Sequence, residues 1–191
     1  MLTNGYMFNE KEVVTKILNG DTRAFELLVK QYERLVFFVV NRLVKDEDDI
    51  LDICQEVFIK IHKGLFRFNF QSKLSTWIAQ VTYFTAINYL KKYKKEQVGA
   101  YPDDIENYHF TNDNPEELLT KKEVANYVEQ LISQLPEVYR TVITLYHLNE
   151  FSCEEIGEIT GMPEGTIKSY LFRARKLLKQ KIEVYLKNDT I

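Results

Sequence analysis

The chain has 191 residues, of which 45% are hydrophobic, with 12 Phe and 12 Tyr against only 7 Gly and 4 Pro. This composition supports a folded core and excludes a disordered chain. The formal net charge of -3 argues against a uniformly basic nucleic-acid binder. The charges are uneven, however, because residues 96–120 hold 7 acids and no Lys or Arg, whereas residues 166–187 hold 7 bases and one acid. A local basic surface can therefore still meet phosphate.

Several further classes of protein are disfavoured by the sequence. Cys54 and Cys153 fall in different helical segments, so we expect no disulfide and a reducing cytoplasm. The three histidines show no zinc-ligand spacing, and we expect no metal or cofactor. The first 20 residues carry charges without an apolar run, which predicts no signal peptide. The most apolar stretch, 35–44, is too short for a membrane span, so we expect no membrane insertion.

The first half of the chain predicts helices in succession. Asn9 or Glu10 is expected to begin a short helix ending near Gly20, and Asp21 to cap a long one. One apolar stripe is predicted along this long helix, formed by Phe25, Leu28, Val29, Tyr32, Leu35, Val36, Val39 and Leu43. The acids at 46–49 favour the start of a third helix, which is expected to reach about Gly64.

A Phe-rich loop, 65–71, then precedes a fourth helix, which is expected to start near Ser72 or Ser75 and to end in the basic run 91–95. Residues 96–114 lack periodicity and predict an acidic, flexible linker. Helix starts are predicted at 114–117 and 135–137, each with a proline. The predicted fold is therefore all-α, with two small helical domains, 1–95 and 115–191, joined by the linker.

Residues 151–179 predict a helix, a tight turn and a second helix. Ser152 and Glu155 form a capping box, Gly161 ends the first helix, and Pro163 starts the second. One face of the second helix is apolar, formed by Ile167, Tyr170, Leu171, Ala174, Leu177 and Leu178. A short buried helix crossed by a basic, exposed one is the geometry of a recognition helix in the major groove. The alternative is a helical hairpin with a solvated basic face.

Two blocks of sequence resemble bacterial alternative sigma factors of the extracytoplasmic-function group. The first comprises DILDICQEVF at 49–58, STWI at 75–78 and AINYL at 86–90. The second runs from LPE at 135–137 through PEGTIKS at 163–169 to FRAR at 172–175. The resemblance covers nearly all of the chain outside the linker and termini. It implies a protein that binds core RNA polymerase and promoter DNA, has no catalytic centre and is usually controlled by an anti-sigma factor.

The resemblance assigns the main polymerase contact to the third helix. Asp52, Gln55 and Glu56 match the family's acidic and amide positions, and their spacing places them on one side of the helix with Ile59. Val57, Ile61 and Leu65 are expected to face the core. Carboxylates on this side suit a basic coiled-coil partner. The alternative is a solvated acidic face at a helix start.

The resemblance also assigns promoter contacts. In the first domain, Trp77 and the Phe-rich loop match the part that holds unpaired minus-ten DNA, and Lys91 and Lys92 are expected to meet phosphate. Alternatively, Trp77 belongs to the core. Tyr83, Phe84 and Asn88 depart from the family's pattern, so details of minus-ten recognition are not carried over. In the second domain, the expected minus-thirty-five contacts are Thr166, Lys168, Ser169, Phe172 and Arg173.

Two other functions stay open on the residues alone. An autonomous helix-turn-helix regulator would bind an operator without polymerase, but it leaves the first block unexplained. A helical adaptor that binds only proteins does not account for the basic recognition helix. An enzyme is the least favoured class, because no phosphate-binding loop, nucleophile with its base, or metal cluster is visible.

Overall fold

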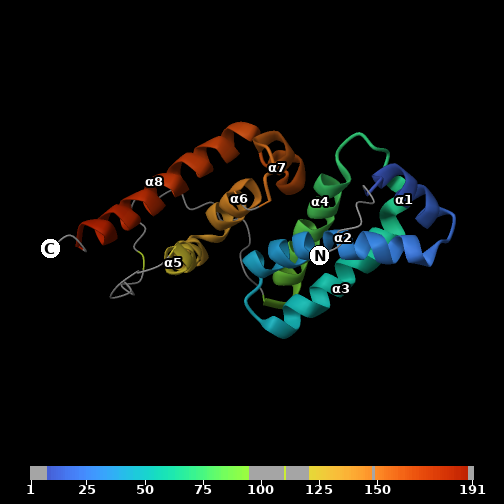
Figure 1. Ribbon diagram of the computed structural model, residues 1–191, viewed down its shortest axis with the longest axis horizontal. Coiled ribbons are helices and arrows are strands. Elements are labelled where there is room, and N and C mark those ends of the chain that lie inside the picture. Colours follow the sequence, from blue (N-terminus) through green and yellow to red (C-terminus); the bar gives the residue numbers. More distant parts are fainter. Residues whose placement is uncertain (1–7, 95–109, 111–120, 148, 189–191) are drawn as a thin grey trace. The chain divides into compact units, whose positions relative to one another are not determined.

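The computed structural model describes residues 8–94, 110, 121–147 and 149–188, and its regular elements in these ranges are all helices (Figure 1). The chain divides into two compact units, one ending at Tyr89 and the other beginning at Leu90. The all-α prediction is confirmed for the described residues. The predicted linker lies outside them except for Phe110, as does the helix start predicted at 114–117, so the proposed domain boundaries stay predictions.

The first unit contains α1 (Glu10–Leu18), α2 (Thr22–Leu43), α3 (Glu47–Gly64), the short turn η1 (Leu65–Arg67) and α4 (Leu74–Tyr89). Each of the first three helices is capped by a side chain just before it. Asn9, Asp21 and Asp46 accept hydrogen bonds from backbone N–H groups of the following turn at 2.9–3.2 Å. These are the starts that the sequence predicted, because short polar side chains satisfy donors that a helix leaves unpaired.

The core of the first unit lies where α2, α3 and α4 pack together. Its most buried side chains come from all three helices and include Leu28, Val36, Val57, Ile61, Leu74 and Ile78. Two tyrosine hydroxyls join helices at the rim: Tyr32 donates to Glu10 at 2.9 Å and Tyr89 donates to Asp49 at 2.5 Å. The Asp49 carboxylate that accepts this bond raises the pKa of Tyr89 to about 12.

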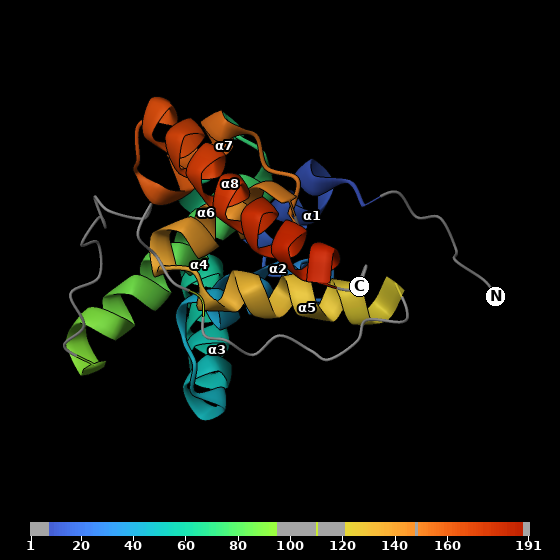
Figure 2. The ribbon, with the colours of Figure 1, turned by 90° about the vertical axis from the view of Figure 1, so that its left-hand side faces the viewer.

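The second unit contains α5 (Lys121–Gln134), α6 (Glu137–His147), α7 (Cys153–Thr160) and α8 (Glu164–Asn188). The long α8 packs against each of the other three, as the red helix in Figure 2 shows. Tyr139 on α6 is fully buried and contacts the ring of Tyr170 on α8, with 4.8 Å between centroids. Tyr170 is therefore a packing residue, as its place on the predicted apolar stripe indicated.

The fourth helix differs from its predicted end. We expected one continuous helix into the basic run, but the α-helix ends at Tyr89 and a π-helical turn, η2 (Leu90–Lys94), follows. In this turn Leu90 is buried, whereas Lys91, Lys92 and Tyr93 are exposed. A wider turn changes the angular spacing of side chains, so the α-helical period did not predict which way these lysines face.

Candidate polymerase-binding and DNA-binding surfaces

The acidic side of α3 is exposed as the sequence predicted. Asp52, Gln55 and Glu56 are all solvent-accessible, whereas Val57 and Ile61 on the opposite side are fully buried. Glu56 is held by Lys60, whose Nζ lies 2.7 Å from its Oε1 and also donates to Thr85 Oγ1 on α4 at 3.4 Å. The structure thus brings the three predicted residues onto one accessible face whose charge suits a basic partner.

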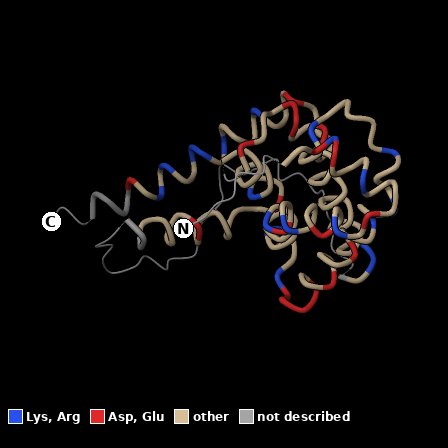
Figure 3. The backbone as a smooth tube through the Cα atoms, turned by 45° about the vertical axis from the view of Figure 1, so that its right-hand side comes forward, with Lys and Arg blue, Asp and Glu red and all other residues tan. Residues whose placement is uncertain are grey.

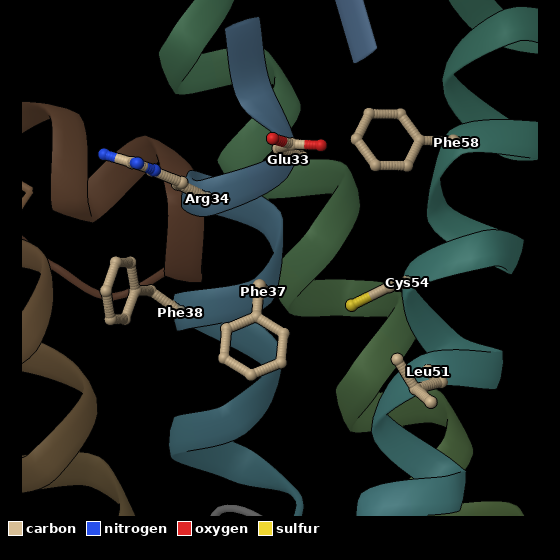
Figure 4. Close-up of a pocket in the computed structure, with 7 residues that line it drawn as sticks. All are labelled: Glu33, Arg34, Phe37, Phe38, Leu51, Cys54 and Phe58. Carbon is tan, nitrogen blue, oxygen red and sulfur yellow. The ribbon is translucent and has the colours of Figure 1, made fainter. Parts of the chain in front are cut away.

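An apolar groove lies beside this acidic side, between α2 and α3 (Figure 4). Its volume is about 460 Å³, and it is lined by Glu33, Arg34, Phe37, Phe38, Leu51, Cys54 and Phe58. Phe37, Phe38 and Leu51 are 43%, 40% and 57% exposed, which is unusual for side chains of this size. Burial raises the pKa of the Cys54 thiol, so this cysteine remains a neutral, apolar part of the groove wall.

Sequence reasoning missed this groove. The predicted stripe on α2 is confirmed in part: five of its eight residues are buried, whereas Phe25, Val29 and Leu35 are partly exposed. Phe37 and Phe38 lie off this stripe. Two adjacent large aromatics outside the apolar stripe of an amphipathic helix were the available signal. Their meeting with Leu51 and Phe58 of α3 depends on how the two helices pack.

The aromatic residues of the predicted minus-ten surface divide into buried and exposed members. Trp77 is half-buried, with its ring 5.5 Å from that of Phe68. A Cβ added at Gly64 would lie 3.6 Å from the Trp77 ring. Phe66 and Phe70, in contrast, are 66% and 44% exposed. Arg67 lies 5.2 Å from the centre of the Phe66 ring, which places a cation beside an open aromatic face.

The basic run that follows α4 is accessible to solvent. Lys91 and Lys92 are both exposed, and the ammonium of Lys92 lies 4.7 Å from the centre of the Tyr93 ring. The structure places them on η2, whereas Trp77 lies on α4 more than three turns earlier. The predicted minus-ten residues therefore come from two different helical elements.

The helix-turn-helix is built as its sequence predicted. Ser152 Oγ accepts from Glu155 N at 3.1 Å while the Glu155 carboxylate accepts from Ser152 N at 2.8 Å. Gly161 ends α7 with φ of 77°, a conformation that other residues rarely adopt. A Cβ at Gly157 would lie 3.1 Å from the carbonyl oxygen of Met162, so glycine there lets the turn approach α7 closely. These local features fix the angle at which α8 leaves the turn.

The two faces of α8 differ in how deeply their side chains are buried. Ile167, Leu171 and Ala174 are buried on the apolar side. On the other side, Lys168 and Phe172 are exposed, the latter by 68%, and Thr166, Ser169 and Arg173 are partly exposed. Lysines and arginines recur along α8, as the blue segments in Figure 3 show. The five predicted DNA-contact residues thus lie along one accessible side.

An ion pair at the start of α8 was not predicted. Glu164, the first residue of the helix, places Oε1 2.7 Å from Nζ of Lys168. The hydrogen bond and the charge of Glu164 raise the pKa of Lys168, so the lysine stays fully charged at neutral pH. The spacing of four residues was the available signal.

A second apolar groove lies within the second unit. It has a volume of about 440 Å³ and is lined by residues of α5, α6 and α8, among them Val128, Ile132, Ile143 and Leu178. His147 and Arg175 lie at its edge. Burial, together with the nearby charge of Arg175, lowers the pKa of His147.

The described residues hold no group of three or more His, Cys, Asp and Glu side chains placed to bind a metal ion. Within the same part of the chain, no helix has the length and apolar character needed to span a membrane.

Comparisons with known proteins match both units. Residues 28–96 match Sigma-70 region 2, and residues 125–178 match Sigma-70 region 4. The ECF RNA polymerase sigma-E factor of Haemophilus influenzae is 36% identical over 183 residues, covering 91% of this chain and 95% of the relative. The protein of the same description from Escherichia coli is 35% identical over 181 residues, covering 91% and 94%.

Solved structures share the fold at low identity. CnrH in complex with the cytosolic domain of CnrY aligns with a TM-score of 0.64 at 17% identity, covering 91% of this chain and 97% of that one. The sigma factor RpoE in complex with the anti-sigma factor NepR from Bartonella quintana aligns with a TM-score of 0.60 at 19% identity, covering 85% and 99%. The chain therefore belongs to the extracytoplasmic-function group of RNA polymerase sigma factors, which direct promoter-specific initiation of transcription.

Proposed function

We propose that this alternative sigma factor binds core RNA polymerase through the acidic side of α3 and recognises the minus-thirty-five element through α8. The observation that carries the proposal is that the residues matching the family's contact positions are accessible to solvent on both helices. Asp52, Gln55 and Glu56 form one exposed acidic face, and Lys168 and Arg173 lie on the accessible side of a helix that a helix-turn-helix presents.

The polymerase contact is tested by charge reversal. The double variant Asp52→Lys, Glu56→Lys should no longer co-purify with core polymerase, because lysines would repel a basic partner. Both side chains are exposed, so the fold should persist by circular dichroism. The matched control, Glu26→Lys with Glu158→Lys, changes the charge equally at exposed sites elsewhere and should bind core normally. Normal core binding by the folded Asp52/Glu56 variant would rule out this surface.

The promoter contact is tested on a minus-thirty-five duplex with holoenzyme. Arg173→Ala should weaken binding by about 1–3 kcal/mol if the side chain contacts a base edge. A phosphate contact would instead weaken binding to all sequences alike and reduce the salt slope by about one. Lys179→Ala, at an exposed lysine two turns further along α8, should change sequence preference little. If Arg173→Ala alters neither affinity, preference nor salt slope, α8 is not the recognition helix.

Trp77, Lys91 and Lys92 belong to the proposed minus-ten surface, together with the exposed Phe66 and Phe70. What supports this role is a pair of exposed aromatic rings, one of which, Phe66, lies beside Arg67. Unpaired bases stack on aromatic side chains, and their phosphates attract lysine and arginine. Because Trp77 is half-buried against Phe68, its contribution is to support the loop as well as to meet DNA.

We also propose regulation by an anti-sigma factor that binds the groove between α2 and α3. The two solved structures compared above are complexes with a protein partner, and the partner in one of them, NepR, is an anti-sigma factor. The exposed apolar side chains beside the acidic face would allow one inhibitor to cover the polymerase contact. Coexpression with the product of the adjacent gene tests this, and Phe37→Ser with Phe38→Ser should relieve inhibition. Unchanged inhibition would place the inhibitor elsewhere.

The remaining proposals concern activity and location. We infer that the protein has no catalytic activity of its own and needs no cofactor, because polymerase carries out the chemistry in transcription. A cytoplasmic location is proposed for the same reason, and it agrees with two cysteines that carry no disulfide. Fractionation with core polymerase tests the location.

A further inference from the structure

The start of α8 presents a hydrogen-bond acceptor directly beside a donor. Glu164 Oε1 and Lys168 Nζ lie 2.7 Å apart, and their side chains are 51% and 64% exposed. At Gly165, between them, an added Cβ would meet nothing within 4 Å. This edge of the helix is therefore uncovered and accessible to a large ligand.

The acid at this position lies where a DNA-binding helix would meet DNA. The first residues of a recognition helix are those that contact base edges, with phosphates on either side. A carboxylate there repels the phosphates of DNA, although it stabilises the helix by interacting with the positive end of the helix dipole. The other exposed pair on α8, Lys179 with Glu183 at 3.6 Å, lies toward the far end of the helix, where no such cost arises.

We propose that Glu164 is a specificity-determining residue that recognises, together with Lys168, one G·C base pair of the minus-thirty-five element. The inference rests on the proposed role of α8. An ammonium has three donors, so Lys168 can bond Glu164 and still donate to guanine O6 and N7. The second oxygen of Glu164 can accept from cytosine N4. Adenine N6 is also a donor in the major groove, so it is the Lys168 contact to guanine O6 and N7 that restricts the pair to G·C.

The pair also explains how a single lysine is kept from non-specific contacts. While Glu164 neutralises it, Lys168 contributes little to the release of counterions from DNA. Without Glu164, Lys168 becomes a free cation beside phosphates. Removing the carboxylate should then strengthen binding to unrelated DNA and weaken discrimination between base pairs in the minus-thirty-five element. Loss of an ordinary attractive contact would not strengthen binding to unrelated DNA.

The test is selection from a double-stranded DNA library, randomised over the minus-thirty-five element, by holoenzyme containing the full-length chain. In Glu164→Ala, the preference for cytosine at one base pair should fall about tenfold, while the preferences at the other base pairs should be unchanged. Its affinity for unrelated duplex should rise, with a salt slope steeper by about one. Glu164→Gln removes the charge but keeps the size, and should show the same change in salt slope. Glu183→Gln, in the matched pair at the other end of α8, should leave preference and slope unchanged.

Three results would overturn the inference, and they have different meanings. If both Glu164 variants select the same sequences as the wild type, Glu164 takes no part in recognition, while the role of α8 stands. If the wild type and Lys168→Ala select identical sequences, the proposed role of α8 fails and the inference fails with it. Higher affinity with unchanged base preference would also contradict the inference, since it shows repulsion alone.

Discussion

Arg175 on α8 donates a hydrogen bond from Nε to Nε2 of His147, the last residue of α6, over 3.0 Å. The same guanidinium lies 4.9 Å from the centre of the Tyr146 ring. Arg175 thus connects α8 to the end of α6. The bond requires a lone pair on His147 Nε2, so it exists only while the imidazole is neutral.

This contact predicts a pH-dependent stability. Because burial and Arg175 lower the pKa of His147 below its usual 6.5, the unfolded chain binds the proton more tightly than the folded one. The contribution of His147 to the free energy of unfolding is therefore fully present above about pH 6.5, and it is lost as the pH falls through the pKa of His147 in the folded state. We expect a loss below about 1 kcal/mol, because the pair is partly exposed. Urea unfolding at pH 7.5 and 5.5 measures it.

The control for this prediction is His147→Gln, which cannot titrate but retains a hydrogen-bond acceptor. The free energy of unfolding of this variant should fall less than that of the wild type between the two pH values. Parallel losses in wild type and variant would show that His147 does not carry the pH dependence.

The capping box of α7 predicts a measurable loss of stability. Ser152→Ala removes the acceptor of the Glu155 N–H bond and should cost about 1 kcal/mol in urea unfolding. Ser133→Ala is the matched control, since Ser133 is exposed and bonds only a carbonyl of its own helix. The control should change stability by less than about 0.5 kcal/mol. Equal effects would mean that the cap does not stabilise the turn.

The aromatic loop predicts that two substitutions have different effects. Trp77→Ala should destabilise the fold by about 1–3 kcal/mol, because it removes packing against Phe68. Phe66→Ala, at a side chain 66% exposed, should leave stability within about 0.5 kcal/mol. If Phe66 stacks on an unpaired base, its loss should weaken holoenzyme binding to single-stranded minus-ten DNA by about 1–3 kcal/mol. A stable Trp77→Ala protein would contradict the packing role.

The division into two units predicts dependence on polymerase. The isolated protein should bind promoter duplex poorly, because binding must fix two separate DNA-contacting units at a conformational cost. Core polymerase would hold them at promoter spacing and so raise the effective concentration of the second contact. Fluorescence anisotropy at near-physiological salt, with and without core, measures the difference. Tight, specific binding by the protein alone would favour an autonomous regulator.

The sequence alone determined the features that depend on near neighbours in the chain. Asp21 and Ser152 predicted the starts of two helices, because a cap bonds backbone groups two or three residues away. The acids at 46–49 predicted a third start through the helix dipole, and Asp46 also caps it. The buried face of α8 followed from the three-residue and four-residue spacing of Ile167, Leu171 and Ala174. The turn before α8 followed from Gly161, whose positive φ favours glycine.

Tertiary structure decided what depends on packing between helices. It brought Phe37 of α2 beside Leu51 and Phe58 of α3 in one groove, although periodicity treats each helix separately. It buried half of Trp77 against a loop residue and joined Arg175 to His147, 28 residues away along the chain. Such contacts arise from the crossing of helices, and no local pattern in the sequence records where two helix surfaces meet.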